Sequence, residues 1–190
     1  MEAAVRTKRE DLVQAAKKLM CQRGYEAVSP RDLLDESGAG QGSFYHHFRS
    51  KHDLAMAALE EVSSEMQALA HEILDAGPSP LEGINAYLGL PRDGLKGCRM
   101  GRFANEASIV DTSLRAPIEN YFRDLQATLA KALRAEQAAG ELAGHLDAEE
   151  LALMLLAVIQ GGFALSRIYR DRNAVRRATD MAAKILGMLV

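Results

Sequence analysis

The sequence lacks the features that mark secreted and membrane-spanning proteins. Its 190 residues include two cysteines, Cys21 and Cys98, which are too few and too far apart for a disulfide framework. No apolar run follows the first basic residues, so we expect no signal peptide. No apolar stretch reaches the roughly 20 residues that cross a bilayer, and the nearest, residues 151–165, is short and polar at both ends. These absences predict a protein of the reducing cytoplasm.

The sequence also lacks the motifs on which many enzymes depend. It contains no glycine-rich phosphate loop, no His-x-x-x-His metal pair and no nucleophile elbow. His46 and His47 are adjacent, so a helix would place them on different faces, and His71 and His145 are isolated. We therefore expect no catalytic residue, no metal site and no cofactor, and we predict that the protein is not an enzyme.

Charge is nearly balanced, at −3 for the whole chain, which argues against a general coat for nucleic acid. Residues 1–53 hold 9 Lys or Arg and 8 Asp or Glu, a net charge of +1, whereas the remainder carries −4. This modest asymmetry has the sign expected if the N-terminal part meets phosphate. With so small a net charge, binding of this region to phosphate would depend on where its individual cations are placed and not on its overall field.

Hydrophobic spacing predicts an all-α protein of about nine helices, because no segment alternates convincingly as a strand. Thr7 is expected to cap a first helix that runs to about Arg23, and Gly24 to end it in the left-handed αL conformation. Further helices are predicted over 51–76, 80–90, 95–110, 112–139, 148–169 and 175–189, with Ser50, Thr112 or Ser113, and Asp147 as caps.

Residues 29–48, SPRDLLDESGAGQGSFYHHF, predict two short helices joined by a glycine-containing turn. Ser29 can cap the first of them, and Pro30 suits its first helical position. The turn Gly38-Ala39-Gly40 separates them, and the second extends to Phe48. Such a pair is a helix-turn-helix, whose second helix lies in the DNA major groove with its N-terminal residues at the base edges.

The second helix of this pair has side chains suited to DNA. Phe44 and Phe48 are four residues apart and should point into the core, which leaves the other side for polar groups. Gly42 would let the backbone approach DNA closely. The polar side chains expected to meet phosphates or base edges are Gln41, Ser43, Tyr45 and His46, with Lys51 just beyond.

Residues 6–60 resemble the N-terminal DNA-binding domain of the TetR family of bacterial transcriptional regulators. The most specific segments are RGYEAVS, GSFYHHF and SKHDL at this spacing. Gly40 and Gln41 depart from the family pattern, which often has a small hydroxyl residue and then Lys, and this affects which groups on DNA are met. The resemblance implies a helix-turn-helix domain over 1–53 and a helical effector-binding and dimerisation domain over 54–190. It also adds Ser29 to the DNA-binding set, and Arg6 either as a basic arm on the DNA backbone or, in the simpler interpretation, as solvated charge.

The last two predicted helices are apolar on more than one face, so each must be buried on several sides. They either form internal core or pair with those of a second subunit in a four-helix interface, as the resemblance implies. The residues expected at such an interface are Leu155, Val158, Gly162, Leu165, Ile185 and Leu189. A two-fold homodimer would carry two DNA-binding domains, here called heads. These would fit a palindromic operator with half-sites about 34–36 Å apart.

The resemblance also implies a cavity in the C-terminal domain that binds a small effector. Candidate lining residues are Met66, Leu69, Tyr87, Cys98, Phe103, Asn105, Tyr121, Met154 and Phe163, a mostly apolar set that suits a hydrophobic or aromatic compound. A ligand of this kind releases DNA only if it binds the DNA-incompetent state more tightly. Repressor is the default implied by the family, with activator left open.

Two alternatives remain at this point. Cys98 lies between Lys96 and Arg99, near the start of a predicted helix, which would favour a thiolate that senses electrophiles or oxidants. A passive, half-buried thiol is the simpler interpretation of the same residue. The chain could also be a dimerisation protein that does not bind DNA, although such a protein would not need the polar row of Ser43, Tyr45 and His46.

Overall fold

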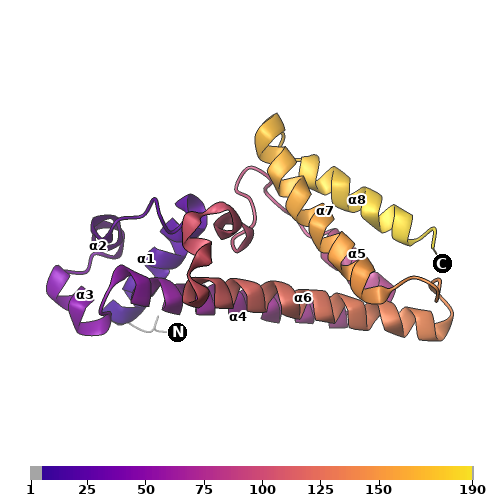
Figure 1. Cartoon of the computed structure of the whole chain (residues 1–190), viewed down its shortest axis with the longest axis horizontal. Coiled ribbons are helices and arrows are strands. Elements are labelled where there is room, and N and C mark those ends of the chain that lie inside the picture. Colours follow the sequence, from indigo (N-terminus) through magenta and orange to yellow (C-terminus); the bar gives the residue numbers. More distant parts are fainter. Residues whose placement is uncertain (1–5, 190) are drawn as a thin grey trace, which may run out of the picture. The chain divides into compact units, whose positions relative to one another are not determined.

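The computed structural model describes residues 6–189, and these contain eight α-helices, two short 3-10 helices and no strand. The all-α prediction is confirmed, with one α-helix fewer than the approximate number expected. The chain forms two compact units: residues 6–64 with 99–120, and residues 65–98 with 121–189. Figure 1 labels the helices in chain order.

The first unit begins with α1 (Lys8–Arg23), α2 (Pro30–Ser37) and α3 (Gln41–His47). Thr7 and Ser29 cap α1 and α2 as predicted, and each takes part in a capping box. Gly24 ends α1 with φ 90° and ψ 167°, so the αL conformation expected there is wrong. The αL residue is Gly38, at the C-cap of α2. Local hydrogen bonds therefore fix the beginnings of both helices.

The helix-turn-helix is packed from its inner face. Phe44 and Phe48 are almost fully buried together with Leu12, Leu33 and Leu54, which confirms the predicted inward direction of the two rings. α4 (Lys51–Asp75) follows immediately. Its N-terminus is capped by the Ser50 hydroxyl, which accepts the Asp53 N–H at 3.1 Å. The apolar face of α3 is thus fixed to the core while its other face is left outward.

The helix predicted over 95–110 is wrong. Residues 94–96 form a turn, and Gly97 has φ 79°, which interrupts any continuous helix. Two 3-10 helices follow, η1 (Gly101–Asn105) and η2 (Ala107–Val110). α6 (Thr112–Ala139) then begins with Asp111 as its cap, because the Asp111 carboxylate accepts the Ser113 N–H at 2.9 Å. The caps predicted at Thr112 or Ser113 are therefore one or two residues late.

The second unit contains α5 (Pro80–Leu88), α7 (Ala148–Tyr169) and α8 (Ala174–Leu186), with the later parts of α4 and α6. Asp147 caps α7 as predicted. α7 and α8 lie side by side (Figure 1). Gly162 permits their close approach, because a Cβ on it would lie 2.9 Å from the Cα of Val175.

α7 is long and apolar enough, by length and composition, to cross a membrane. The expectation that no stretch meets this test is therefore wrong. The same test is passed by core helices of globular proteins, and α7 packs part of its surface into the second unit. Its buried residues are Ala148, Ala152, Leu155, Leu156, Ile159, Gly162, Phe163 and Ser166.

Candidate nucleic-acid interface and regulatory residues

The outer face of α3 carries the polar side chains that the sequence predicts for DNA. Gln41, Gly42, Tyr45 and His46 are exposed, and Ser43 is half-buried. Tyr45 is 60% exposed although its ring contacts the buried Phe44 ring in an edge arrangement, with centroids 5.2 Å apart. This contact holds the phenol at the surface. The face therefore offers a hydroxyl, an amide and an imidazole to a ligand with many hydrogen-bonding groups.

The beginning of α3 is open to close approach. Gly40 is its N-cap and provides no side-chain hydrogen bond. A Cβ added at Gly40 or at Gly42 would meet no other atom of the chain within 4 Å. The missing side chains are therefore not explained by packing within the described residues. They suit a surface where another molecule comes near the backbone.

Two of the predicted DNA-binding side chains already have structural contacts. The Ser29 hydroxyl accepts the Asp32 N–H. The Ser29 hydroxyl and backbone N–H both donate to the Asp32 carboxylate, and these two bonds hold the Asp32 pKa below its usual value. The Lys51 ammonium lies 4.1 Å from the centroid of the Tyr25 ring. Desolvation lowers the Lys51 pKa, although Glu106, Glu26 and Asp32 oppose the effect. Arg6 is exposed just before α1.

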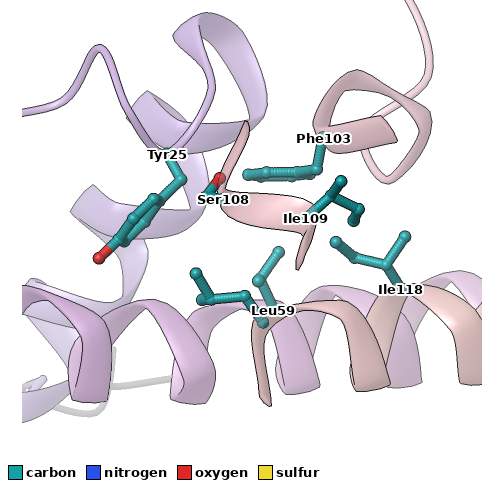
Figure 2. A pocket seen from close by; sticks show the side chains of 7 residues that line it. Tyr25, Leu59, Phe103, Ser108, Ile109 and Ile118 are labelled. Carbon is teal, nitrogen blue, oxygen red and sulfur yellow. The ribbon is translucent and has the colours of Figure 1, made fainter. Parts of the chain in front are cut away.

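A small cavity lies in the first unit, and Figure 2 shows the side chains around it. Its volume is about 10 Å³, which is room for about one water molecule. Phe103, predicted to line an effector pocket, lines this cavity instead, and Asn105 is exposed in the same unit. The full lining comprises Tyr25, Leu59, Phe103, Ser108, Ile109, Leu114 and Ile118.

Three of the predicted effector residues come together in the second unit. Tyr87 and Tyr121 are buried, and the two phenols are near enough for each to affect the pKa of the other. Burial raises the pKa of both phenols, and Cys98 is near enough to raise both further. Arg92 lies over the Tyr87 ring at 5.2 Å and donates to the carbonyls of Tyr87, Leu88 and Leu90. These side chains therefore form one polar cluster in the second unit, whose buried core is mostly apolar.

The other predicted effector residues are scattered. Met66 is half-buried and Phe163 is buried, whereas Leu69 and Met154 are exposed. A separate groove of about 210 Å³ lies between the loop after α4 and one side of α6, and none of the predicted residues lines it. Its lining comprises Leu74, Asp75, Gly77, Pro78, Ser79, Pro80, Thr128, Lys131, Ala132 and Ala135. The role of Cys98 as a thiol sensor stays a prediction.

The predicted interface residues divide into two groups. Leu155 and Gly162 are buried within the chain itself, Gly162 against α8, so a second subunit could not reach them. Leu165 and Ile185 are exposed, and Val158 and Leu189 are half-buried. The sequence reasoning missed several large hydrophobic side chains on or next to α7 and α8 that are more exposed than these, among them Leu153, Ile168, Met181 and Met188. α7 is apolar on more than one face, so its sequence gave no signal of which side was free.

Among the described residues, no group of three or more His, Cys, Asp or Glu side chains could hold a metal ion. The sequence reasoning also missed the contacts that Arg102, Glu106 and Ser108 make with the end of α1 and the turn after it. These join residues about 80 positions apart, for which a single sequence gives no signal.

The comparisons with known proteins agree on one family. Residues 12–58 match the profile described as bacterial regulatory proteins, tetR family, and residues 84–182 match a tetracyclin repressor-like C-terminal domain. An uncharacterized HTH-type transcriptional regulator from Lactococcus lactis is 30% identical over 186 residues, which cover 93% of this chain and 92% of the relative.

Two solved structures at 25% identity share the fold along nearly the whole chain. The reduced form of NemR from Escherichia coli has a TM-score of 0.83 and covers 95% of this chain and 97% of its own. A TetR family regulator from Agrobacterium tumefaciens has a TM-score of 0.85, with 94% and 97% covered.

Proposed function

Because this chain belongs to the TetR family of bacterial transcriptional regulators, we propose that it is a repressor that a small molecule releases from a palindromic operator. It is a DNA-binding regulator of the helix-turn-helix type. The observation that supports the DNA-binding role most directly is the outer face of α3. Its polar side chains are exposed while Phe44 of the same helix and Phe48 at its end are buried. We propose that the protein acts by binding DNA and an effector, with no catalytic step. Its proposed location is the cytoplasm.

Residues on and around α3 would divide the work of recognition. Gln41, Ser43, Tyr45 and His46 would meet base edges and phosphates, and Gly42 would allow the backbone to come close. Arg6 would contribute charge from the chain before α1. Lys51 and Ser29 would contact DNA while they keep their contacts within the first unit, which are the Tyr25 ring for Lys51 and the Asp32 N–H for Ser29.

The proposed partner is a second copy of the chain, joined through the outward faces of α7 and α8. Large apolar side chains there are exposed in the single chain, which is costly for a protein that stays monomeric. A two-fold pair would hold two heads for two half-sites. The proposed contact residues are Leu153, Val158, Leu165, Ile168, Met181, Ile185, Met188 and Leu189.

The proposed effector is a small hydrophobic or aromatic compound bound in the second unit. Tyr87, Cys98 and Tyr121 would provide its polar contacts, and Met66 and Phe163 part of its apolar surroundings. A compound of this kind needs few polar anchors in a mostly apolar site.

The DNA-binding role is tested by selecting duplexes from a randomised pool with the purified protein, followed by footprinting on the DNA that flanks its own gene. We expect an enriched palindrome that is protected in the footprint. Tyr45→Ala should abolish binding without changing the helical content or the oligomeric state. Tyr45→Phe, which keeps the ring contact with Phe44, serves as the matched variant. Undiminished affinity of Tyr45→Ala at equal salt would show that Tyr45 on α3 does not contribute to operator binding, whereas a wild-type protein that enriches no duplex would favour the dimerisation protein that does not bind DNA.

A further inference from the structure

Residues 101–110, here called the strap, lie far along the chain from the helix-turn-helix but belong to the same compact unit. The carboxylate of Glu106 accepts the backbone N–H groups of Tyr25 and Glu26, each at 3.1 Å. These two amides belong to the turn that follows α1. A carboxylate that accepts two N–H groups makes charge-assisted bonds, which are stronger than those between neutral groups.

Two further hydrogen bonds fix the strap to the same place. The Ser108 N–H donates to the Glu26 carboxylate at 2.7 Å, so each of the two glutamates accepts from the other segment. Arg102 donates to the carbonyl of Cys21 at 2.9 Å. That carbonyl lies in the last turn of α1, where a cation is favourable and carbonyls lack partners within the helix.

The residue that ends α1 is adapted to this contact. Gly24 has φ 90°, and a Cβ on it would collide with the Glu106 carboxylate. Any other residue at position 24 would therefore displace the carboxylate from the two amides. The absence of a side chain at Gly24 is explained by Glu106 as well as by the backbone conformation.

The turn that Glu106 holds is connected to the start of α4. The Tyr25 ring lies under the Lys51 ammonium, 4.1 Å from the ring centroid, and Glu106 and Glu26 favour the charged form of that ammonium. Lys51 is the first residue of α4 and comes shortly after the end of α3. Because cations lie favourably over aromatic rings, Glu106, Tyr25 and Lys51 form a continuous series of contacts that ends at the first residue of α4, shortly after α3 in the chain.

We propose that Glu106 is a positioning residue for operator binding: it fixes the turn between α1 and α2 and, through Tyr25 and Lys51, the position of α3. The inference rests on the proposed DNA-binding function. In this proposal Lys51 helps to position α3, and the strap is part of the DNA-binding head. Binding energy depends on pre-ordered groups, so a looser turn would lower affinity without removing any group that touches DNA.

The test compares Glu106→Gln with Glu60→Gln in the full-length protein, using a duplex that the wild-type protein selects from a randomised pool. Glu60 is exposed on α4 in the same unit, so both variants remove one negative charge from the head. Loss of negative charge alone would strengthen binding to phosphate. We expect Glu106→Gln to bind about tenfold more weakly than Glu60→Gln, in line with the loss of a charge-assisted hydrogen bond. Equal affinities of the two variants would overturn the proposal.

Amide hydrogen exchange supplies a second readout that does not need DNA. In Glu106→Gln the amides of Tyr25 and Glu26 should exchange about tenfold faster, while those of α7 keep the wild-type rate. Unchanged exchange at both amides would also overturn the proposal. If the wild-type protein enriches no duplex, the DNA-binding function fails, and exchange still decides whether Glu106 holds the turn.

A double-mutant cycle separates positioning from general loss of stability. Gly24→Ala should weaken operator binding by a larger factor in the wild-type background than in Glu106→Ala, because the collision is absent in the latter. The backbone strain at position 24 is common to both and cancels. Fold-changes that simply multiply would show that the Glu106 carboxylate does not crowd position 24, and they would contradict the proposed contact.

Discussion

Gly42 is the residue where stability and function are expected to conflict most clearly. It lies inside α3, where glycine costs up to about 1 kcal/mol relative to alanine. A Cβ there would meet no atom of the chain within 4 Å, so the fold does not require its absence. We attribute its absence to the proposed approach of DNA to the backbone of α3.

We predict that Gly42→Ala raises the free energy of unfolding by about 0.5–1 kcal/mol and weakens operator binding. Urea denaturation and DNA titration of the same preparation measure the two effects. Gly144→Ala is the control, because a Cβ at this loop position also meets nothing within 4 Å. Unaltered DNA affinity of Gly42→Ala would mean that the backbone of α3 does not approach the duplex.

The phenols of Tyr87 and Tyr121 give a pH dependence at the same scale. Burial raises the pKa of both above the ordinary 10.0, because the folded state favours the neutral form. Their contribution to stability is therefore complete below pH 10 and is lost as pH rises above it, since the unfolded chain ionises there first. We expect the absorbance of these two phenolates to appear together with alkaline unfolding. Ionisation of all 5 tyrosines before the helical signal changes would contradict this assignment.

At the scale of elements, the starts of α1, α2 and α7 were predictable because their capping signal is local. Thr7, Ser29 and Asp147 each bond to amides within three residues, so a single sequence contains both partners. The segment after Gly97 was not predictable, because its conformation is fixed by bonds from Glu106 and Arg102 to residues about 80 positions away. The same distinction applies to the candidate site, since the direction of Phe44 follows from helical spacing whereas the surroundings of Lys51 do not.

The free side of α7 was unpredictable for a related reason. A helix that is apolar around most of its circumference gives no indication of which stripe its neighbour covers. In the structure, two adjacent glycines show which side of α7 faces α8 and which side is free. Gly162 is buried against Val175 on α8, whereas Gly161 is exposed with open space around it.

This pair predicts opposite effects of one substitution. Gly162→Ala should destabilise the protein by about 1–3 kcal/mol, because the added methyl group forces α7 and α8 apart. Gly161→Ala should leave the stability of the single chain unchanged or raise it by up to about 1 kcal/mol. Urea denaturation at one protein concentration compares them. Equal destabilisation by both would show that the two helices do not pack as described.

At the scale of the whole molecule, operator affinity should depend on pairing of two chains. Each head presents one short helix, and joining two heads makes the second contact effectively intramolecular. Ile168 and Met181 are 71% and 53% exposed on α7 and α8, so a lysine at either position would place a charge in the proposed interface. The two substitutions remove no group from the head.

We predict that Ile168→Lys combined with Met181→Lys yields a folded monomer whose operator affinity falls by about a hundredfold or more, the size of effect that linking two binding sites provides. Sedimentation gives the mass, and titration of the full palindrome gives the affinity. Leu95→Lys, at a residue that is 40% exposed elsewhere in the second unit, is the control and should remain a dimer. A double variant that stays dimeric would place the interface on another surface.

The apolar character of α7 has a consequence for biosynthesis. The ribosome releases α7 before α8, its packing partner, because α8 begins at Ala174 and follows in the chain. For the time taken to add those residues, at about 5–20 residues per second, the emerging polypeptide exposes a segment that resembles a membrane anchor in length and composition. Truncation after Tyr169 should therefore yield nascent chains that aggregate or associate with membranes, although the complete chain hides part of that surface.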